Sequence, residues 1–179
     1  MAAVSSSDGA RLHGRFTLRT FRDGLVSAER TADNILCAAG LSVLVTAVNW
    51  SAVEDQNGAM GDPFSTTYLA PILGALGSGS GTPAATDTAL FAELAYSDYA
   101  RQVVSAAGTT AASGSNPGSI VWEFFFPTTA EAWTITECGV FAAATLTTGS
   151  LLDHAVISPS VTKPAGETAL LQVVISVGN

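Results

Sequence analysis

Charged residues are scarce in this chain. Asp, Glu, Lys and Arg make up 12% of its 179 residues, about half of their share in an ordinary soluble domain. Apolar residues make up 47%, enough for a substantial core in a single domain. A surface with so few charges must consist mainly of Ser, Thr, Gly and Ala, and we expect much of it to be covered by other molecules. The composition therefore predicts an oligomer or a member of an assembly.

Basic residues are also few, and they are unevenly placed. Residues 1–30 hold five basic and three acidic residues, a net charge of +2, while the rest of the chain holds two basic and twelve acidic residues, a net charge of -10. The five early basic residues are Arg11, Arg15, Arg19, Arg22 and Arg30. An acidic body argues against nucleic acid as the main partner. We expect residues 1–30 to form a basic arm and strand that docks on an acidic surface, and residues 31–179 to form the body.

Cysteine and histidine are nearly absent, which limits the chemistry available. Cys37 and Cys138 lie in apolar surroundings and are expected to be buried free thiols, although one bridge between them is conceivable. Asp153-His154 could be half of a metal site or of an Asp–His relay, but no residues at ligand spacing complete a zinc site and no nucleophile motif is present. We expect an exposed pair at a strand edge, with no metal, no cofactor and no catalytic residue.

No segment has the features of a targeting or membrane sequence. The first eight residues lack both a basic and an apolar region, so they do not predict a signal peptide. Residues Ile35 to Val53 are free of charge and long enough to span a bilayer. Polar residues and Gly40 interrupt them, and no positive flank adjoins them, so a core helix is the better interpretation.

Alternating hydrophobicity predicts a chain made mainly of strands. Leu12 to Phe21 alternates between apolar residues and an outer face rich in arginine, and Asp23-Gly24 is typical of a hairpin turn. Further strands are expected at Thr67–Leu76, Tyr99–Ala106, Ser119–Phe126, Trp133–Ala142, Ser150–Ser158 and Thr168–Val177. Short strands at this spacing predict an antiparallel β-sandwich or jelly-roll-like domain.

Two helices are expected beside the strands. Thr31 or Asp33 could cap a helix over about residues 33–48, and Thr86 or Asp87 could cap a short helix from Thr88 to Leu94. Gly77 to Gly81 is interpreted as a flexible loop. It is not a phosphate-binding loop, because no Gly-Lys-Ser/Thr follows it.

Glu137 is the main candidate for a functional residue, because it places a carboxylate in the middle of the apolar strand Trp133–Ala142. A carboxylate there is costly unless it is paired or hydrogen-bonded. We expect Glu137 to form a structural pair with Arg101 or to accept backbone N–H groups from a neighbouring loop. A general acid or base with a raised pKa is the alternative, but it needs a second catalytic group and none is evident.

Two other clusters have both a functional and an ordinary interpretation. Glu54, Asp55, Asn57 and Asp62 could hold a calcium ion, but their spacing misses the twelve-residue calcium loop, so a solvated turn is expected. Trp122 and Phe124 to Phe126 could form a carbohydrate platform, but in mid-strand they indicate core, or core together with a subunit interface.

Several blocks occur in an order that resembles a family of tailed-bacteriophage virion proteins. They are the Gly-Ser-Gly-Ser-Gly-Thr-Pro-Ala-Ala-Thr-Asp-Thr-Ala-Leu stretch from Gly77 to Leu90, then Glu93 and Arg101, then Ile-Thr-Glu-Cys-Gly-Val-Phe from Ile135 to Phe141, and the last strands up to Val177. The resemblance is to tail-collar, fibre-attachment and small capsid-associated proteins, and it covers about Gly77 to Val177. Cys138 and Val140 depart from the commoner residues of the last block.

The resemblance implies a non-enzymatic structural protein of the virion, assembled in the cytoplasm of the bacterial host. Such a protein would self-associate as a trimer or larger oligomer and dock on major capsid or tail proteins. We favour a capsid decoration or cement protein, with a tail, collar or baseplate component as the alternative. A hydrolase using Glu137 or Asp153-His154, or a carbohydrate-binding module, is a more distant hypothesis.

Overall fold

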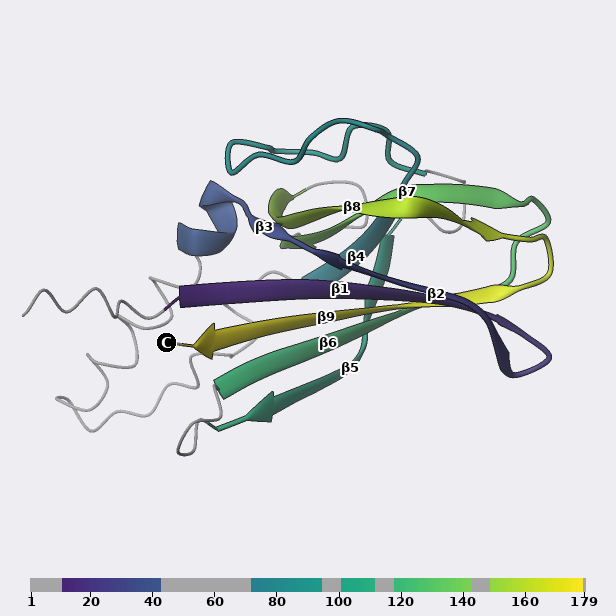
Figure 1. The fold of residues 1–179 in the computed structure, drawn as a ribbon, viewed down its shortest axis with the longest axis horizontal. Helices are drawn as coiled ribbons and strands as arrows, with labels where there is room; N and C mark the ends of the chain where they lie inside the picture. The colour runs from purple at the N-terminus through teal and green to yellow at the C-terminus, as the bar shows by residue number, and fades with distance from the viewer. Residues whose placement is uncertain (1–10, 43–71, 95–100, 112–117, 143–148, 179) are drawn as a thin grey trace, which may run out of the picture.

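The computed structural model describes residues 11–42, 72–94, 101–111, 118–142 and 149–178. Within these ranges the chain is mainly antiparallel β-strand (Figure 1). The strands are β1 (Arg11–Arg22), β2 (Leu25–Asp33), β3 (Ile35–Leu36), β4 (Ile72–Gly77), β5 (Arg101–Thr110), β6 (Gly118–Phe126), β7 (Trp133–Ala142), β8 (Ser150–Lys163) and β9 (Thr168–Gly178). The mainly β class predicted from the sequence is confirmed.

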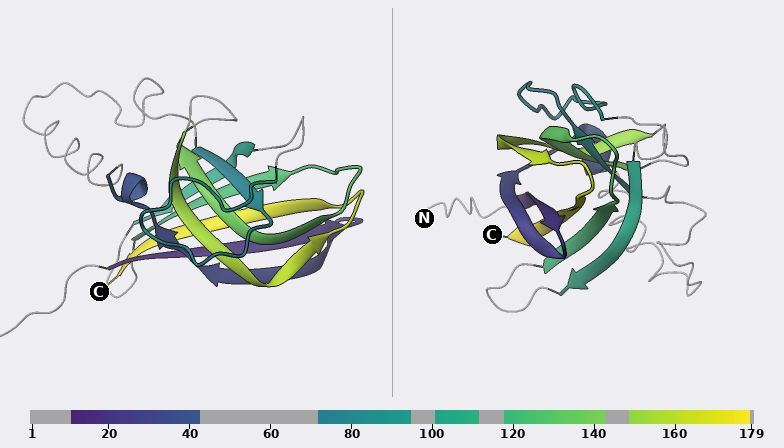
Figure 2. Two further views of the ribbon diagram at one scale, coloured as in Figure 1. Left: turned by 90° about the horizontal axis from the view of Figure 1, so that it is seen from above. Right: turned by 90° about the vertical axis from the view of Figure 1, so that its right-hand side faces the viewer.

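The nine strands form one sheet that curls until its two ends approach each other. The order across the sheet is β2-β1-β9-β6-β5-β4-β7-β8-β3, and β2 lies against β8. Asn34 alone separates β2 from β3, so one continuous segment supplies both ends of the sheet. Viewed from one end, the strands surround a common interior (Figure 2). A sandwich or jelly roll consists of two packed sheets, whereas these nine strands belong to one continuous sheet. The finer prediction of a sandwich or jelly-roll-like domain is therefore not confirmed.

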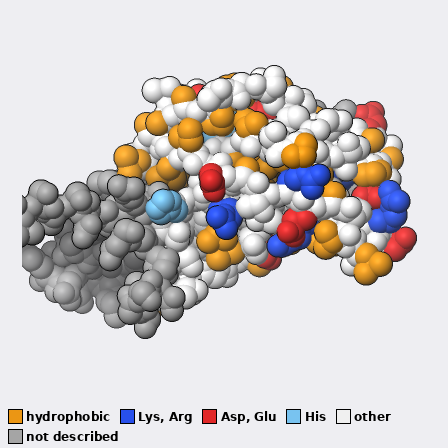
Figure 3. Space-filling model, in the orientation of Figure 1, with side chains coloured by type: hydrophobic (Ala, Val, Ile, Leu, Met, Phe, Trp, Pro, Cys, Tyr) orange, Lys and Arg blue, Asp and Glu red, His pale blue; other side chains and the backbone are white. Residues whose placement is uncertain are grey.

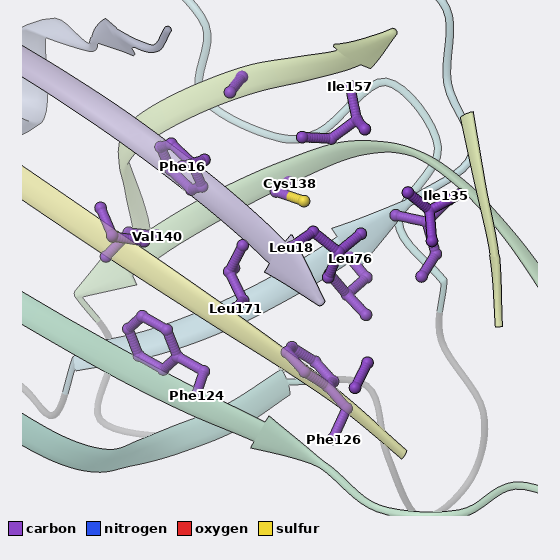
Figure 4. Close-up of a cluster of buried hydrophobic side chains, with 14 of the residues drawn as sticks. Phe16, Leu18, Leu76, Phe124, Phe126, Ile135, Cys138, Val140, Ile157 and Leu171 are labelled. Atoms are coloured by element: carbon purple, nitrogen blue, oxygen red, sulfur yellow. The ribbon is translucent and has the colours of Figure 1, made fainter. Parts of the chain in front are cut away.

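Side chains from around the curl meet in this interior. Phe16 of β1, Phe124 of β6 and Val140 of β7 are fully buried and point inward from three different strands (Figure 4). Leu171 and Ile157 join them from β9 and β8. In β1 and β9 alternating residues such as Phe16, Leu18, Leu171 and Val173 fill the interior, as expected for strands with one buried face. Phe124 and Phe126 are core residues, as predicted, while Phe125 between them faces outward and is 46% exposed.

The hairpin of β1 and β2 is part of this body. Asp23 and Gly24 both have positive φ (51° and 79°), the geometry of the tight turn that Asp-Gly predicts. β1 pairs with β9 from Arg11 to Phe21, and Phe16 and Leu18 lie in the core. The predicted division at residue 30 is therefore wrong. That boundary runs through β2, and residues 11–30 are an integral hairpin instead of a separate arm.

The first predicted helix, over about residues 33–48, begins later than expected, and the second predicted helix is wrong. Thr31 and Asp33 lie in β2, and Ile35 and Leu36 form β3, because backbone pairing with β1 and β8 satisfies their amides. Helix begins at residue 38 and its described part ends at residue 42. Residues 88–94 form no helix. They form an irregular loop, of which Glu93 pairs with Gly77.

The remaining strand predictions are confirmed with small changes at the ends. β7 coincides with the predicted strand, and β8 continues five residues beyond Ser158 to Lys163. β4 begins at Ile72, and the part of that prediction before Ile72 lies outside the described residues, as does the Glu54–Asp62 cluster. Among the described residues, no helix is both long and apolar enough to cross a membrane.

Candidate functional site

The pairing of β7 with β8 is irregular next to Glu137, whose side chain lies on the outer side of the sheet. Ile135 pairs with Val161 but Glu137 pairs with Val156, so β8 carries three extra residues opposite Thr136. Ile135 and Cys138 on either side of the shift face the interior. Thr136 and Glu137 both contact the loop of residues 78–94, and the Thr136 hydroxyl donates to the carbonyl of Gly79 at 2.6 Å. The loop therefore covers the outer face of β4, β7 and β8.

The Glu137 carboxylate is fully buried and holds this loop by its backbone. Oε1 accepts the N–H of Gly79 at 2.9 Å and that of Ala92 at 2.7 Å. Oε2 accepts the N–H of Phe91 at 3.0 Å and lies 3.0 Å from Nε2 of His154. The second of the two sequence-based alternatives, backbone N–H groups from a neighbouring loop, is thus confirmed. Each oxygen has two partners, which is the arrangement that offsets the cost of a buried carboxylate.

His154 connects Glu137 to a second carboxylate. Its ring is fully buried, and Nδ1 lies 2.8 Å from Oδ2 of Asp87. Asp87 also accepts the N–H of Ala84 at 2.9 Å. That backbone hydrogen bond, together with His154, holds the pKa of Asp87 below its usual value. The ring of Phe91 packs on His154 with centroids 4.8 Å apart. We call Asp87, His154, Glu137 and the three backbone N–H groups the Glu137 clasp.

Arg101 does not pair with Glu137, so this part of the prediction is wrong. Its guanidinium donates to both oxygens of Glu93, at 2.7 Å and 2.9 Å, and lies 3.6 Å from the centroid of the Phe141 ring. The backbone pairing of Glu93 with Gly77 brings its carboxylate to Arg101. Glu93 and Arg101 therefore fasten the end of the loop. Glu137 joins Gly79 near its start to Phe91 and Ala92 near its end.

Two glycines make room for the Glu137 carboxylate. A Cβ atom added at Gly77 would lie 2.4 Å from Oε1 of Glu137, and one added at Gly79 would lie 2.5 Å from the same oxygen. Both distances are too short for any side chain without movement of the carboxylate. The sequence predicts a flexible loop over Gly77 to Gly81, but at Gly77 and Gly79 glycine serves close packing. The sequence signal for this contact is the alternation of glycine at positions 77, 79 and 81, together with the single carboxylate in the later strand Trp133–Ala142.

A small second core lies under the loop. It consists of Cys37, Leu73, Ala75, Leu90, Phe141 and Leu151, all buried. Burial raises the pKa of the Cys37 thiol to about 11, so the thiol is protonated at neutral pH and is a poor nucleophile. Cys138 faces the main interior instead, and both cysteines are free, as expected. The loop is thus held by apolar contacts as well as by the clasp.

Asp153 and His154 are both buried, so the predicted exposed pair is wrong. Asp153 faces away from the clasp and accepts a hydrogen bond from the side chain of Asn34. Its other oxygen has no hydrogen-bond partner in the described structure. Burial raises the pKa of Asp153 to about 8. Gly14 on β1 lets the Asn34 side chain pass, because a Cβ atom there would overlap it.

The arginines assigned to docking lie on the hairpin of β1 and β2. Arg19 pairs with Glu29, and Arg22 binds the buried carboxylate of Glu167. Arg15 is exposed and lies 3.9 Å from Asp33. Several of these charges therefore serve the hairpin itself, and a docking role for Arg11, Arg15, Arg19, Arg22 and Arg30 stays a prediction.

The arrangement offers structural restraint more readily than catalysis. The Glu137 oxygens and both nitrogens of His154 are occupied, and neither residue is exposed. Two cavities at the start of β1 are lined by residues that include His13, Gly14 and Asn34, and neither is lined by Glu137 or His154. In the part of the chain that the structure describes, no three His, Cys, Asp or Glu side chains are grouped to hold a metal ion.

Comparison of the chain with protein-family models, with curated proteins and with solved structures gave no match.

Proposed function

We propose that this chain is a non-enzymatic structural protein of a tailed-phage virion, which self-associates and docks on the particle. Decoration of the capsid is the role we favour. One observation carries the proposal: the residues through which the sequence resembles such proteins contact one another in one fixed unit. The residues that fasten residues 78–94 to the sheet are Gly77, Gly79, Asp87, Glu93, Arg101 and Glu137.

This contact pattern supports a structural role for the resembling residues. A catalytic carboxylate must reach a substrate, whereas Glu137 is fully buried and bonded on both oxygens. A motif that positions a loop is instead suited to presenting a surface of fixed shape. Fixing the loop in advance lowers the entropy lost when another molecule binds it.

The test is to locate the protein on particles of the virus or prophage that encodes it. Purified virions would be examined by mass spectrometry and by gold-labelled antibodies in the electron microscope. Many copies spread over the head would support decoration, and a few copies at one vertex or along the tail would favour the tail, collar or baseplate alternative. Absence from washed virions that contain their other structural proteins would refute the proposal.

A further inference from the structure

The surface formed by the clasped loop carries almost no exposed charge. The exposed residues between Ser78 and Ala92 are Gly, Ala, Ser, Thr and Phe. The two acidic residues within Ser78–Glu93 are turned inward, since the side chain of Asp87 is 16% exposed and that of Glu93 is 21% exposed. In the view of Figure 3 the upper part of the molecule, where this loop lies, is mostly white and orange. Blue and red side chains gather lower, over the hairpin of β1 and β2.

Three large apolar side chains adjoin the loop and are exposed. Phe91, 43% exposed, lies on the loop against His154. Ile35, 38% exposed, pairs with His154 across β3 and β8 and so shares its outward face. Leu41, 49% exposed, lies on the helical segment 38–42, whose first N–H binds the carbonyl of Ala85. We call the surface made by Ile35, Leu41, Ala85, Thr88, Ala89 and Phe91 the loop face.

We infer that the loop face is where one copy of this chain binds another. The inference rests on the proposed function, which requires self-association. Each copy carries a net charge of -8, so two copies repel unless the surfaces that meet carry little charge. The loop face meets this condition, and its apolar side chains are of the kind that anchor protein interfaces.

The clasp explains why a loop can serve in this way. A free loop of glycine, serine and alanine would lose much conformational entropy on binding. Residues 78–94 are held beforehand by Glu137, by the Glu93–Arg101 pair and by the buried Leu90. The small side chains leave the backbone shape accessible, so a second copy meets a fixed and uncharged surface.

The experiment compares three variants with the wild-type chain by sedimentation and light scattering over a range of concentrations at ~0.15 M salt, where long-range repulsion is largely screened. Leu41→Glu places a charge on the helical part of the loop face, and Ala85→Glu places one on the loop itself. Val26→Glu is the matched control, since Val26 is 53% exposed on the hairpin, away from the loop, and the variant gains the same charge. Thermal unfolding shows whether each variant is folded.

We expect Leu41→Glu and Ala85→Glu to weaken self-association at least tenfold, while Val26→Glu behaves like the wild type. If one of the loop-face variants does not fold, the other decides. A wild-type chain that stays monomeric at every concentration would overturn the inference, as would equal association of all four proteins or equal loss in the control. If the protein is found on virions, its assignment as a virion protein stands after any of these outcomes, whereas a monomeric wild type also removes self-association from the proposed function. Absence from virions leaves a measured loop-face dimer or larger oligomer standing.

Discussion

At the scale of single residues, Glu137 is held mainly by uncharged backbone N–H groups instead of by a basic side chain. Three of its four partners are backbone N–H groups, and the fourth is an imidazole that a second carboxylate orients. A buried carboxylate with this many donors is a strong local restraint. Loss of this carboxylate should therefore loosen the loop more than the rest of the sheet.

Glu137→Gln tests this restraint. A glutamine amide has the same shape, but its NH₂ group would face backbone N–H donors, and a buried donor left without an acceptor costs about 1–3 kcal/mol. We expect a loss of stability of that size in urea unfolding and faster hydrogen exchange at the amides of Phe91 and Ala92. Glu131→Gln, at an exposed position, is the control and should change neither measurement. Unchanged exchange in Glu137→Gln would contradict the clasp.

Gly79→Ala tests the space next to the same carboxylate. The new methyl group would lie 2.5 Å from Oε1 of Glu137 and 2.4 Å from Cβ of Phe91, so the loop has to move. We expect a destabilisation of about 1–3 kcal/mol, as for other overpacked sites, seen as a lower midpoint in thermal unfolding. Gly108→Ala on β5 is a matched control, because no atom lies within 4 Å of its Cβ position. Equal midpoints for the two variants would mean that the loop is not tightly packed.

At the scale of elements, the strands were predictable and the loop was not. Alternation predicts a strand because burial of one face has a period of two residues, and this rule located β1, β6, β7 and β9. The sequence suggests Thr31 or Asp33 as one helix cap, but Asp33 lies in β2 and pairs with β1. It suggests Thr86 or Asp87 as another, but Asp87 contacts His154 in a loop. Such partners lie far apart in the sequence, so a local sequence pattern cannot predict these contacts.

The partner of Glu137 shows the same limit. The need for donors followed from a carboxylate in an apolar strand, and donors are what the structure provides. Arg101 was the nearest candidate by charge, yet it binds Glu93. Charge alone does not separate one salt bridge from another, because the choice depends on which strand each residue occupies and which face it points to.

The hairpin of β1 and β2 leads to a prediction about truncation. Removal of residues 1–30 would delete β1, including the buried Phe16 and Leu18, and would leave the whole of β9 without its partner on that side. We expect the truncated chain to lose cooperative unfolding, measured by circular dichroism during heating. Retention of a cooperative transition near that of the full chain would show instead that residues 1–30 form an accessory segment, as the charge distribution first suggested.

At the scale of the whole molecule, the buried Asp153 should make stability depend on pH. Its pKa is about 8 in the folded chain, above the ordinary value of 3.8, so the folded state binds this proton more tightly than the unfolded state. The contribution of this group is fully present below pH 3.8 and is lost as the pH rises to about 8.

Asp153→Asn removes the titration while keeping an amide that can bind Asn34. We expect the variant to be more stable than the wild type at pH 8 by about 2 kcal/mol or more, since each unit of pKa shift corresponds to about 1.4 kcal/mol. The difference should shrink as the pH falls toward 4. Urea unfolding at a series of pH values gives the comparison, and parallel curves for the two proteins would show that Asp153 has no raised pKa.

The segment that runs through Asn34 supplies the strand at each end of the sheet. An open end of a sheet is a template to which strands of other chains can add, and this is a common start of aggregation. Here β2 lies against β8, so these two elements shield each other. Addition of other chains at these edges is therefore hindered, and the surfaces left for contacts with other molecules are faces whose shape the fold has already set.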